Sequence, residues 1–109
     1  MSLTILAIDD SRTIREMLRE SLFNAGFEVH VAVDGIDGLE KLSEISPNVI
    51  ITDINMPRLD GFGVIEAVRK REDFGALPIL VLTTESAADL KERARNSGAT
   101  GWIVKPFDD

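Results

Sequence analysis

Residues 49–61 read Val-Ile-Ile-Thr-Asp-Ile-Asn-Met-Pro-Arg-Leu-Asp-Gly, and this stretch decides the fold. It opens with an apolar, mostly β-branched run at 49–51, which is typical of a strand buried on both faces. Pro57 cannot donate to a strand ladder and Asp60-Gly61 signals a turn, so the strand ends near Asp53. An acid is therefore placed at the carboxyl end of a buried strand, the edge at which parallel α/β sheets bind ligands.

The rest of the chain alternates predicted strands with predicted helices. Apolar runs predict further strands at 3–8, 27–32, 79–82 and 101–104. Ser11 or Thr13 can cap the first helix, and Asp60 the third. Ser86, followed by Asp89, matches the capping signature for the fourth helix. We therefore predict a flavodoxin-like, doubly wound α/β fold with five parallel strands in the order 2-1-3-4-5 and helices on both faces.

Composition limits the classes of function. The chain has 109 residues, enough for one domain, and its 44 % hydrophobic content is typical of a globular protein. No apolar run approaches the roughly 20 residues of a transmembrane helix. Cysteine is absent, which excludes disulfides and thiolate metal sites, and we expect a cytoplasmic location. The net charge of −7 disfavours nucleic acid and anionic membranes as partners, but accommodates a metal cation or a basic protein surface.

Polar residues follow the ends of most predicted strands: Asp9-Asp10, Asp53, Thr83 and Lys105. In the predicted strand order the topology switches between strands 1 and 3, so the three acids meet there. Three carboxylates within about 4 Å of one another repel by ~4 kcal/mol per pair, which calls for a raised pKa or a divalent cation. Oxygen ligands with open positions suit Mg²⁺. With an ammonium and a hydroxyl beside them, the acids favour in-line transfer of a phosphoryl group onto Asp53.

These motifs resemble the receiver domain of two-component response regulators. The resemblance is carried by Asp9-Asp10, by Asp53 in Asp-Ile-Asn-Met-Pro, by Asp60-Gly61, by Thr83 and by Lys105-Pro106-Phe107. It extends over residues 3–107, nearly the whole chain. Segments 55–57 and 101–107 are most similar to single-domain, CheY-like regulators of chemotaxis.

The resemblance implies that Asp53 is phosphorylated by a histidine of a sensor kinase or phosphotransfer protein. The protein would then be a signalling switch and not an enzyme, apart from its own phosphorylation and slow self-dephosphorylation. Mg²⁺ would be the cofactor, bound by Asp10, Asp53 and the backbone carbonyl of Asn55, with Asp9 acting mainly through a water molecule. An output protein would be the second partner.

The resemblance also implies roles for the remaining site residues. Lys105 and Thr83 would contact the phosphoryl oxygens, and Thr83 would move toward them as the switch is made. Trp102 occupies the aromatic switch position, where the family usually has Tyr or Phe. Asn55 and Glu85 occupy the positions that tune the rate of hydrolysis. The Lys105-Pro106 bond is expected to be cis.

The family continues past the fifth strand with a fifth helix, which this chain does not reach. We therefore expect residues 1–109 to be a receiver domain truncated before that helix, with Asp108 and Asp109 at the helix cap. A parallel sheet needs both faces covered, so parts of strands 1 and 5 would present an apolar patch. A dimer could cover that patch.

Other interpretations remain open. The chain can be a receiver domain cut from a multidomain regulator. A flavodoxin-like FMN carrier would use the same crevice, but an acidic cluster repels phosphate and no Gly-rich or Ser/Thr-rich loop follows strand 1. An Mg²⁺-dependent phosphohydrolase needs a second acid where Asn55 stands. Taken singly, Asp9-Asp10 is typical of a solvated turn, and His30 of a structural or solvent-facing residue. The charged runs 69–73 and 91–95 are typical of solvated helix faces.

Overall fold

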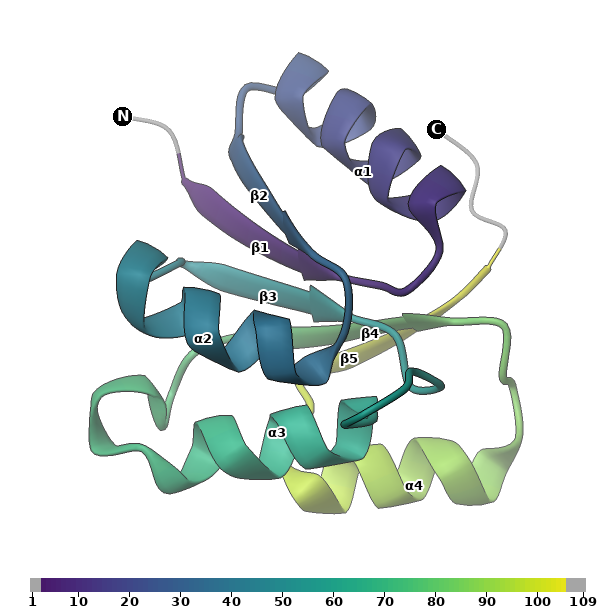
Figure 1. Cartoon of the computed structure of the whole chain (residues 1–109). Coiled ribbons are helices and arrows are strands. Elements are labelled where there is room, and N and C mark those ends of the chain that lie inside the picture. The colour runs from purple at the N-terminus through teal and green to yellow at the C-terminus, as the bar shows by residue number, and fades with distance from the viewer. Residues whose placement is uncertain (1–2, 106–109) are drawn as a thin grey trace.

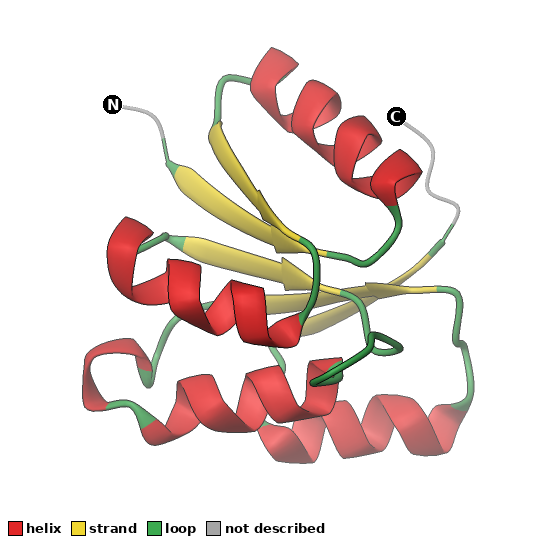
Figure 2. Cartoon of the chain, viewed as in Figure 1, coloured by secondary structure: helices red, strands yellow, loops and turns green. Residues whose placement is uncertain are grey.

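The computed structural model describes residues 3–105, which form a parallel sheet in the order β2-β1-β3-β4-β5. The strands are β1 (Thr4–Ile8), β2 (Glu28–Ala32), β3 (Val49–Thr52), β4 (Ile79–Thr83) and β5 (Gly101–Val104). The helices are α1 (Arg12–Asn24), α2 (Gly35–Ile45), α3 (Gly61–Lys70) and α4 (Ala88–Ser97), with a 3-10 turn at Glu72–Phe74. The predicted fold class and strand order are confirmed, and the described residues end after β5 without a further helix (Figures 1 and 2).

The two faces of the sheet are covered unequally. Helices α2, α3 and α4 lie on one face and α1 on the other (Figure 1). The larger core lies under the three helices, and a smaller cluster around Leu18 and Leu82 lies under α1. Trp102 packs against the larger core, so its neighbour Ile103 points to the α1 face, where it is 44 % exposed. That a second chain covers this part of the α1 face, near β5, stays a prediction.

The prediction that β3 is buried on both faces is only partly correct. Ile50 and Thr52 are fully buried under α2 and α3, whereas Val49 and Ile51 are half-buried. The reason is that α1 contacts mainly β2 and β1, so it does not extend across the middle of the sheet.

Side chains cap the N-termini of three of the four described α-helices. Ser11 caps α1 by accepting a hydrogen bond from the amide of Ile14, and Asp60 caps α3, as predicted. Asp34 caps α2 in the same way. The prediction that Ser86 caps the fourth helix is wrong, because α4 begins one residue later, with Ala87 at its N-cap and no side-chain cap. Asp89 instead lies in the first turn of α4, where a negative charge favours the helix dipole.

Two predictions concern residues outside the described range of 3–105. They are the cis peptide between Lys105 and Pro106 and the helix cap at Asp108 and Asp109.

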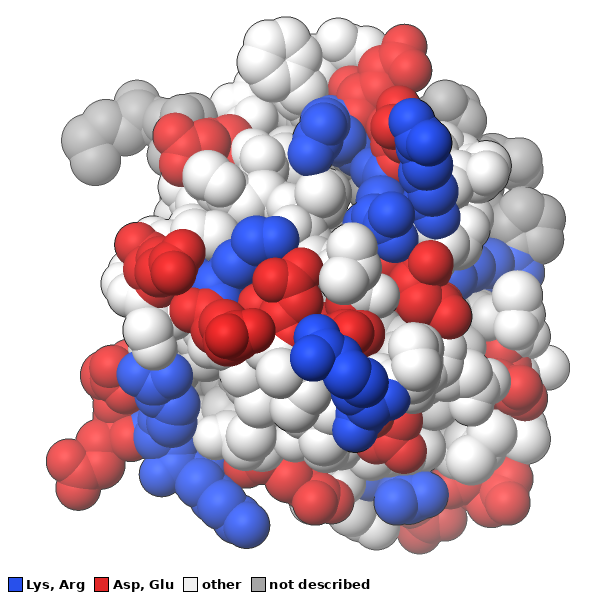
Figure 3. Space-filling view, in the orientation of Figure 1, with Lys and Arg blue, Asp and Glu red and all other residues white. Residues whose placement is uncertain are grey.

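Charged side chains cover much of the face shown in Figure 3. Lys and Arg gather over α1, which carries Arg12, Arg15 and Arg19, while acidic and basic side chains are intermixed below it. Among the described helices, none combines the length and the apolar character needed to cross a bilayer.

Candidate functional site

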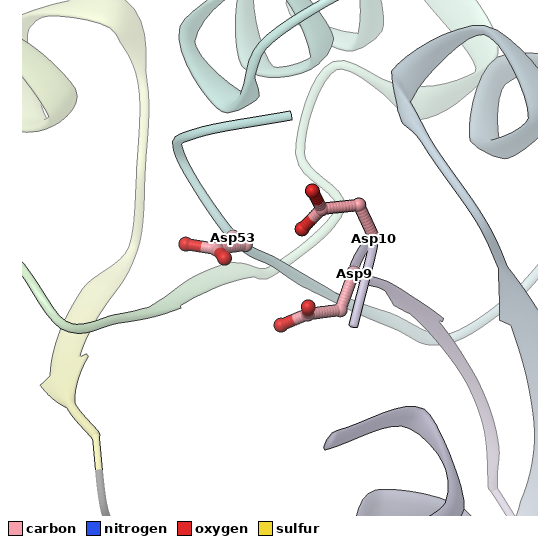
Figure 4. Close-up of side chains that lie close together, drawn as sticks. All are labelled: Asp9, Asp10 and Asp53. Carbon is pink, nitrogen blue, oxygen red and sulfur yellow. The ribbon is translucent and has the colours of Figure 1, made fainter. Parts of the chain in front are cut away.

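Three carboxylates meet at the carboxyl edge of the central strands. Ile8 at the end of β1 pairs in parallel register with Thr52 at the end of β3, so the next residues, Asp9 and Asp53, leave the sheet side by side. One carboxylate oxygen from each of Asp9, Asp10 and Asp53 lies within 4.8 Å of the others. Figure 4 shows the three side chains extending from the neighbouring strand ends toward the same side.

Lys105 reaches this cluster from the end of β5. Its Nζ donates to Oδ2 of Asp9 at 2.7 Å and to Oδ2 of Asp53 at 3.0 Å. The backbone amide of Lys105 donates to the carbonyl of Thr83 at 2.7 Å, which ties the start of this segment to β4. The Lys105 side chain is only 8 % exposed, so its ammonium is a buried counter-charge to two buried acids.

Each buried carboxylate has a second donor. Oδ1 of Asp9 accepts from the amide of Ser11 at 2.9 Å, and Oδ1 of Asp53 accepts from the amide of Ile54 at 2.7 Å. Asp10, in contrast, is exposed. The cluster therefore has two acids oriented by hydrogen bonds and one open to solvent, which gives an ion a route of entry.

The electrostatics of the cluster leave it short of positive charge. Burial raises the pKa of the Asp9 carboxyl, although hydrogen bonds from Lys105 and Ser11 act to lower it. Burial also lowers the pKa of Lys105, but hydrogen bonds to Asp9 and Asp53 outweigh it and the pKa is raised overall. One ammonium thus faces three carboxylates, and a further cation would relieve the remaining repulsion.

The residues present fit a divalent metal ion. The atoms that could bind the ion are all carboxylate oxygens, which are the ligands of hard cations such as Mg²⁺. Clusters of exposed acids are common on protein surfaces, but here Asp9 is 1 % and Asp53 8 % exposed. The single ammonium of Lys105 offsets only part of the cost of burying these like charges together, so this cluster is more than an incidental acidic patch.

The other predicted site residues lie around Glu85, in the loop after β4. The hydroxyl of the fully buried Thr83 accepts from the Glu85 amide at 3.3 Å, and the structure records no hydrogen bond from it to Asp53. Asn55 donates through Nδ2 to Oε1 of Glu85 at 3.2 Å. The indole Nε1 of Trp102 donates to the Glu85 carbonyl at 3.0 Å. Glu85 therefore joins the loop after β3, the loop after β4, and β5.

Comparison with known proteins agrees with this geometry. The family model described as the response regulator receiver domain matches residues 5–109. This chain belongs to that family. The response regulator MprA of Mycobacterium ulcerans is 40 % identical to this receiver domain over 107 residues, 98 % of this chain and 45 % of that protein. MprA of Mycobacterium leprae is 41 % identical over 103 residues, 94 % of this chain and 44 % of that protein.

Solved structures agree as well. The chemotaxis protein CheY4 of Vibrio cholerae superimposes with a TM-score of 0.95 at 44 % identity, covering 99 % of this chain and 90 % of that one. A response regulator protein from Burkholderia multivorans matches with a TM-score of 0.79 at 48 % identity, over 99 % of this chain and 86 % of that one. The receiver domain thus spans less than half of the curated relatives and most of these solved chains.

Two arginines near the site of this receiver domain were missed in the sequence analysis. Arg15, in the first turns of α1, donates through Nη1 to the backbone carbonyl of Asp9 at 2.8 Å. Arg58, in the loop after β3, forms a two-pronged ion pair with Asp34. The position of Arg15 shortly after a predicted cap could have suggested that it faces back to the acidic loop. Nothing local connects Arg58 with an acid that is 24 residues away.

Proposed function

We propose that this receiver domain is the phosphoacceptor of a two-component phosphorelay, and that Asp53 is the residue phosphorylated. The observation that carries the proposal is the buried carboxylate of Asp53, which contacts Lys105 at 3.0 Å and lies beside Asp9 and Asp10. The donor would be a phosphohistidine of a sensor kinase or a phosphotransfer protein. His30, the one histidine of the chain, hydrogen-bonds to Glu28 on the edge strand β2, away from the acids.

In the proposed reaction an oxygen of Asp53 attacks phosphorus as the phosphorus–nitrogen bond to the donor histidine breaks. The product is an acyl phosphate on Asp53 and a free imidazole on the donor. Lys105, already held beside Asp53, would neutralise charge on the phosphoryl oxygens. Mg²⁺ held by Asp9, Asp10, Asp53 and the carbonyl of Asn55 would supply further charge neutralisation.

Phosphorylation would be transmitted through Thr83 and Trp102. We propose that the Thr83 hydroxyl exchanges its hydrogen bond with the Glu85 amide for one to a phosphoryl oxygen. Because Trp102 donates to the carbonyl of Glu85, a shift of this loop would carry to the indole and so to the surface of α4 and β5. Asn55 and Glu85, whose side chains meet across the site, would control access of the hydrolytic water.

The subtype of regulator is a separate proposal. The likeness to CheY4, of which 90 % is covered, favours a single-domain regulator of the chemotaxis type. The likeness to MprA, of which 45 % is covered, supports the alternative of a receiver joined to an output domain. The length of the complete coding sequence separates the two proposals.

The decisive experiment is intact-mass measurement after incubation with acetyl phosphate, with and without Mg²⁺. We expect one phosphoryl adduct that requires the metal and is absent from Asp53→Asn. Asp60→Asn is the matched control, because Asn caps a helix about as well as Asp and residue 60 is a helix cap. An adduct that survives Asp53→Asn would overturn the assignment, and steady hydrolysis of a simple phosphomonoester would favour a phosphohydrolase.

A further inference from the structure

The loop between β3 and α3 is held to the start of α2 by a two-pronged ion pair. Arg58 donates through Nε to Oδ2 of Asp34 at 2.7 Å and through Nη2 to Oδ1 at 2.9 Å. Asp34 is 6 % exposed and also caps α2 through the amide of Asp37. A guanidinium that engages both oxygens of one carboxylate fixes orientation as well as distance, which a lysine cannot do.

The backbone conformation at position 58 is one that few residue types adopt, so the presence of arginine there bears on the role of its side chain. Its φ is +67°, in the left-handed region that glycine and asparagine adopt more readily than other residues. Glycine would relieve the strain at this position, yet the chain has arginine. The side chain must therefore contribute something that offsets the strained backbone, and its described contact is the pair with Asp34.

The same loop is closed at its base and touches α2 directly. The amide of Gly61 donates to the carbonyl of Ile54 at 2.9 Å, so residues 55–60 form a short closed loop. A Cβ placed on Gly35, the first residue of α2, would overlap the carbonyl oxygen of Leu59, so the two backbones are in close contact. Figure 1 shows the β3–α3 connection passing beside the loop that enters α2.

From these contacts we propose that Arg58 is a positioning residue for the metal site. By fastening the tip of the 55–60 loop to Asp34, it limits the motion of the Asn55 backbone before any ligand arrives. The inference rests on the proposed function, in which the Asn55 carbonyl binds Mg²⁺. Loss of a group that hydrogen-bonds a metal ligand directly typically weakens metal binding about 10- to 100-fold, and we expect Arg58, which acts through the loop, to lie at the lower end of that range.

The test compares Arg58→Gly and Arg58→Asn with the wild-type protein. Both replacements tolerate a positive φ, so they relieve the backbone strain while removing the ion pair, and this relief offsets part of the stability that is lost when Asp34 is left without its partner. Asp34→Asn removes the charge of the partner and keeps a residue that can cap α2. Arg71→Ala is the matched control, because Arg71 forms a partly exposed ion pair with Asp73 at the far end of α3.

Three measurements separate a positioning role from a merely structural one. In metal-free protein, hydrogen exchange of the segment 54–61 should be about 10-fold faster in the Arg58 variants than in wild type and Arg71→Ala. The Mg²⁺ dissociation constant from calorimetry should rise about 10-fold. At saturating Mg²⁺, the rate of adduct formation from acetyl phosphate should stay within about twofold of wild type, since the reacting groups are unchanged.

The double variant Asp34→Asn/Arg58→Gly should be no weaker in Mg²⁺ binding than either single variant, because one contact is removed in all three. Unchanged loop exchange and unchanged Mg²⁺ affinity in both Arg58 variants would refute the positioning role alone, provided that the wild-type protein binds Mg²⁺ and forms the adduct. A fall in thermal stability with an unchanged Mg²⁺ affinity would also refute it. Wild-type protein that takes up neither the metal nor the phosphoryl group would refute the proposed function and this inference together.

Discussion

Replacement of Lys105 by Met should destabilise the metal-free protein strongly and in a pH-dependent way. Lys105→Met keeps an unbranched apolar stem and removes the ammonium that contacts Asp9 and Asp53. The two carboxylates are then left buried beside one another without that counter-charge. Breaking a buried ion pair by removing one partner typically costs about 3–5 kcal/mol.

Proton uptake by one carboxyl sets an upper limit on this cost. Burial already raises the pKa of Asp9 above its ordinary value of 3.8, and loss of the Lys105 hydrogen bond raises it further. Wherever the folded variant keeps a proton that the unfolded chain has released, its stability falls as pH rises above the ordinary value. At about 1.4 kcal/mol per pH unit above 3.8, the limit is about 4.5 kcal/mol at pH 7 and about 1.7 kcal/mol at pH 5. We expect a loss of about 3 kcal/mol at pH 7 and about 1.5 kcal/mol or less at pH 5.

Urea unfolding in the presence of a chelator measures this directly, with the fluorescence of Trp102, the single tryptophan of the chain, as the probe. Lys70→Met is the control, because Lys70 is an exposed residue at the end of α3. A loss below about 1 kcal/mol at pH 7, or a loss that is the same at both pH values, would show that Lys105 does not hold the acids together as described.

Two further substitutions test the scaffold around the site. Arg69→Met should lower the free energy of unfolding by about 2 kcal/mol, because the Arg69 guanidinium donates to the backbone carbonyls of Gly98 at 2.7 Å and Leu77 at 2.6 Å. Urea unfolding measures this loss, with Lys70→Met as the control, and equal losses in the two variants would contradict the prediction. Gly61→Ala should lower the free energy of unfolding by about 1–3 kcal/mol and slow adduct formation, since the added Cβ would overlap the carbonyl oxygen of Asp53. A variant with wild-type stability that is phosphorylated at the wild-type rate would contradict this close packing.

Local patterns predicted the architecture well. The alternation of apolar runs with amphipathic segments, together with the preference for right-handed crossovers, left few topologies, and the flavodoxin-like order that we took among them, β2-β1-β3-β4-β5, is confirmed. The helix caps at Ser11 and Asp60 were correct because a cap bonds within its own turn. The signature at Ser86 failed because the matching residues were present but α4 started one residue later.

Contacts between distant segments were not predictable in this way. Arg69 was predicted to lie on a solvated helix face, but it is half-buried and donates to carbonyls at the ends of α4 and of the α3–β4 connection. The ion pair between Arg58 and Asp34 joins two loops whose sequences give no sign of each other. Both involve long side chains that can reach several partners, and packing selects among them.

The sequence by itself determined which residues end the strands, and therefore that Asp9, Asp10 and Asp53 gather at one edge of a parallel sheet. Side-chain alternation and strand ends follow from local backbone geometry, so they can be recognised along the chain. The sequence also placed Lys105 in this site, but tertiary structure alone decided that it contacts Asp9 and Asp53 in particular. It also decided that Glu85 receives both Asn55 and Trp102, and that Arg58 fastens the 55–60 loop to Asp34 at the start of α2. Those contacts depend on where separate elements come to rest against a common core, which no single stretch of sequence encodes.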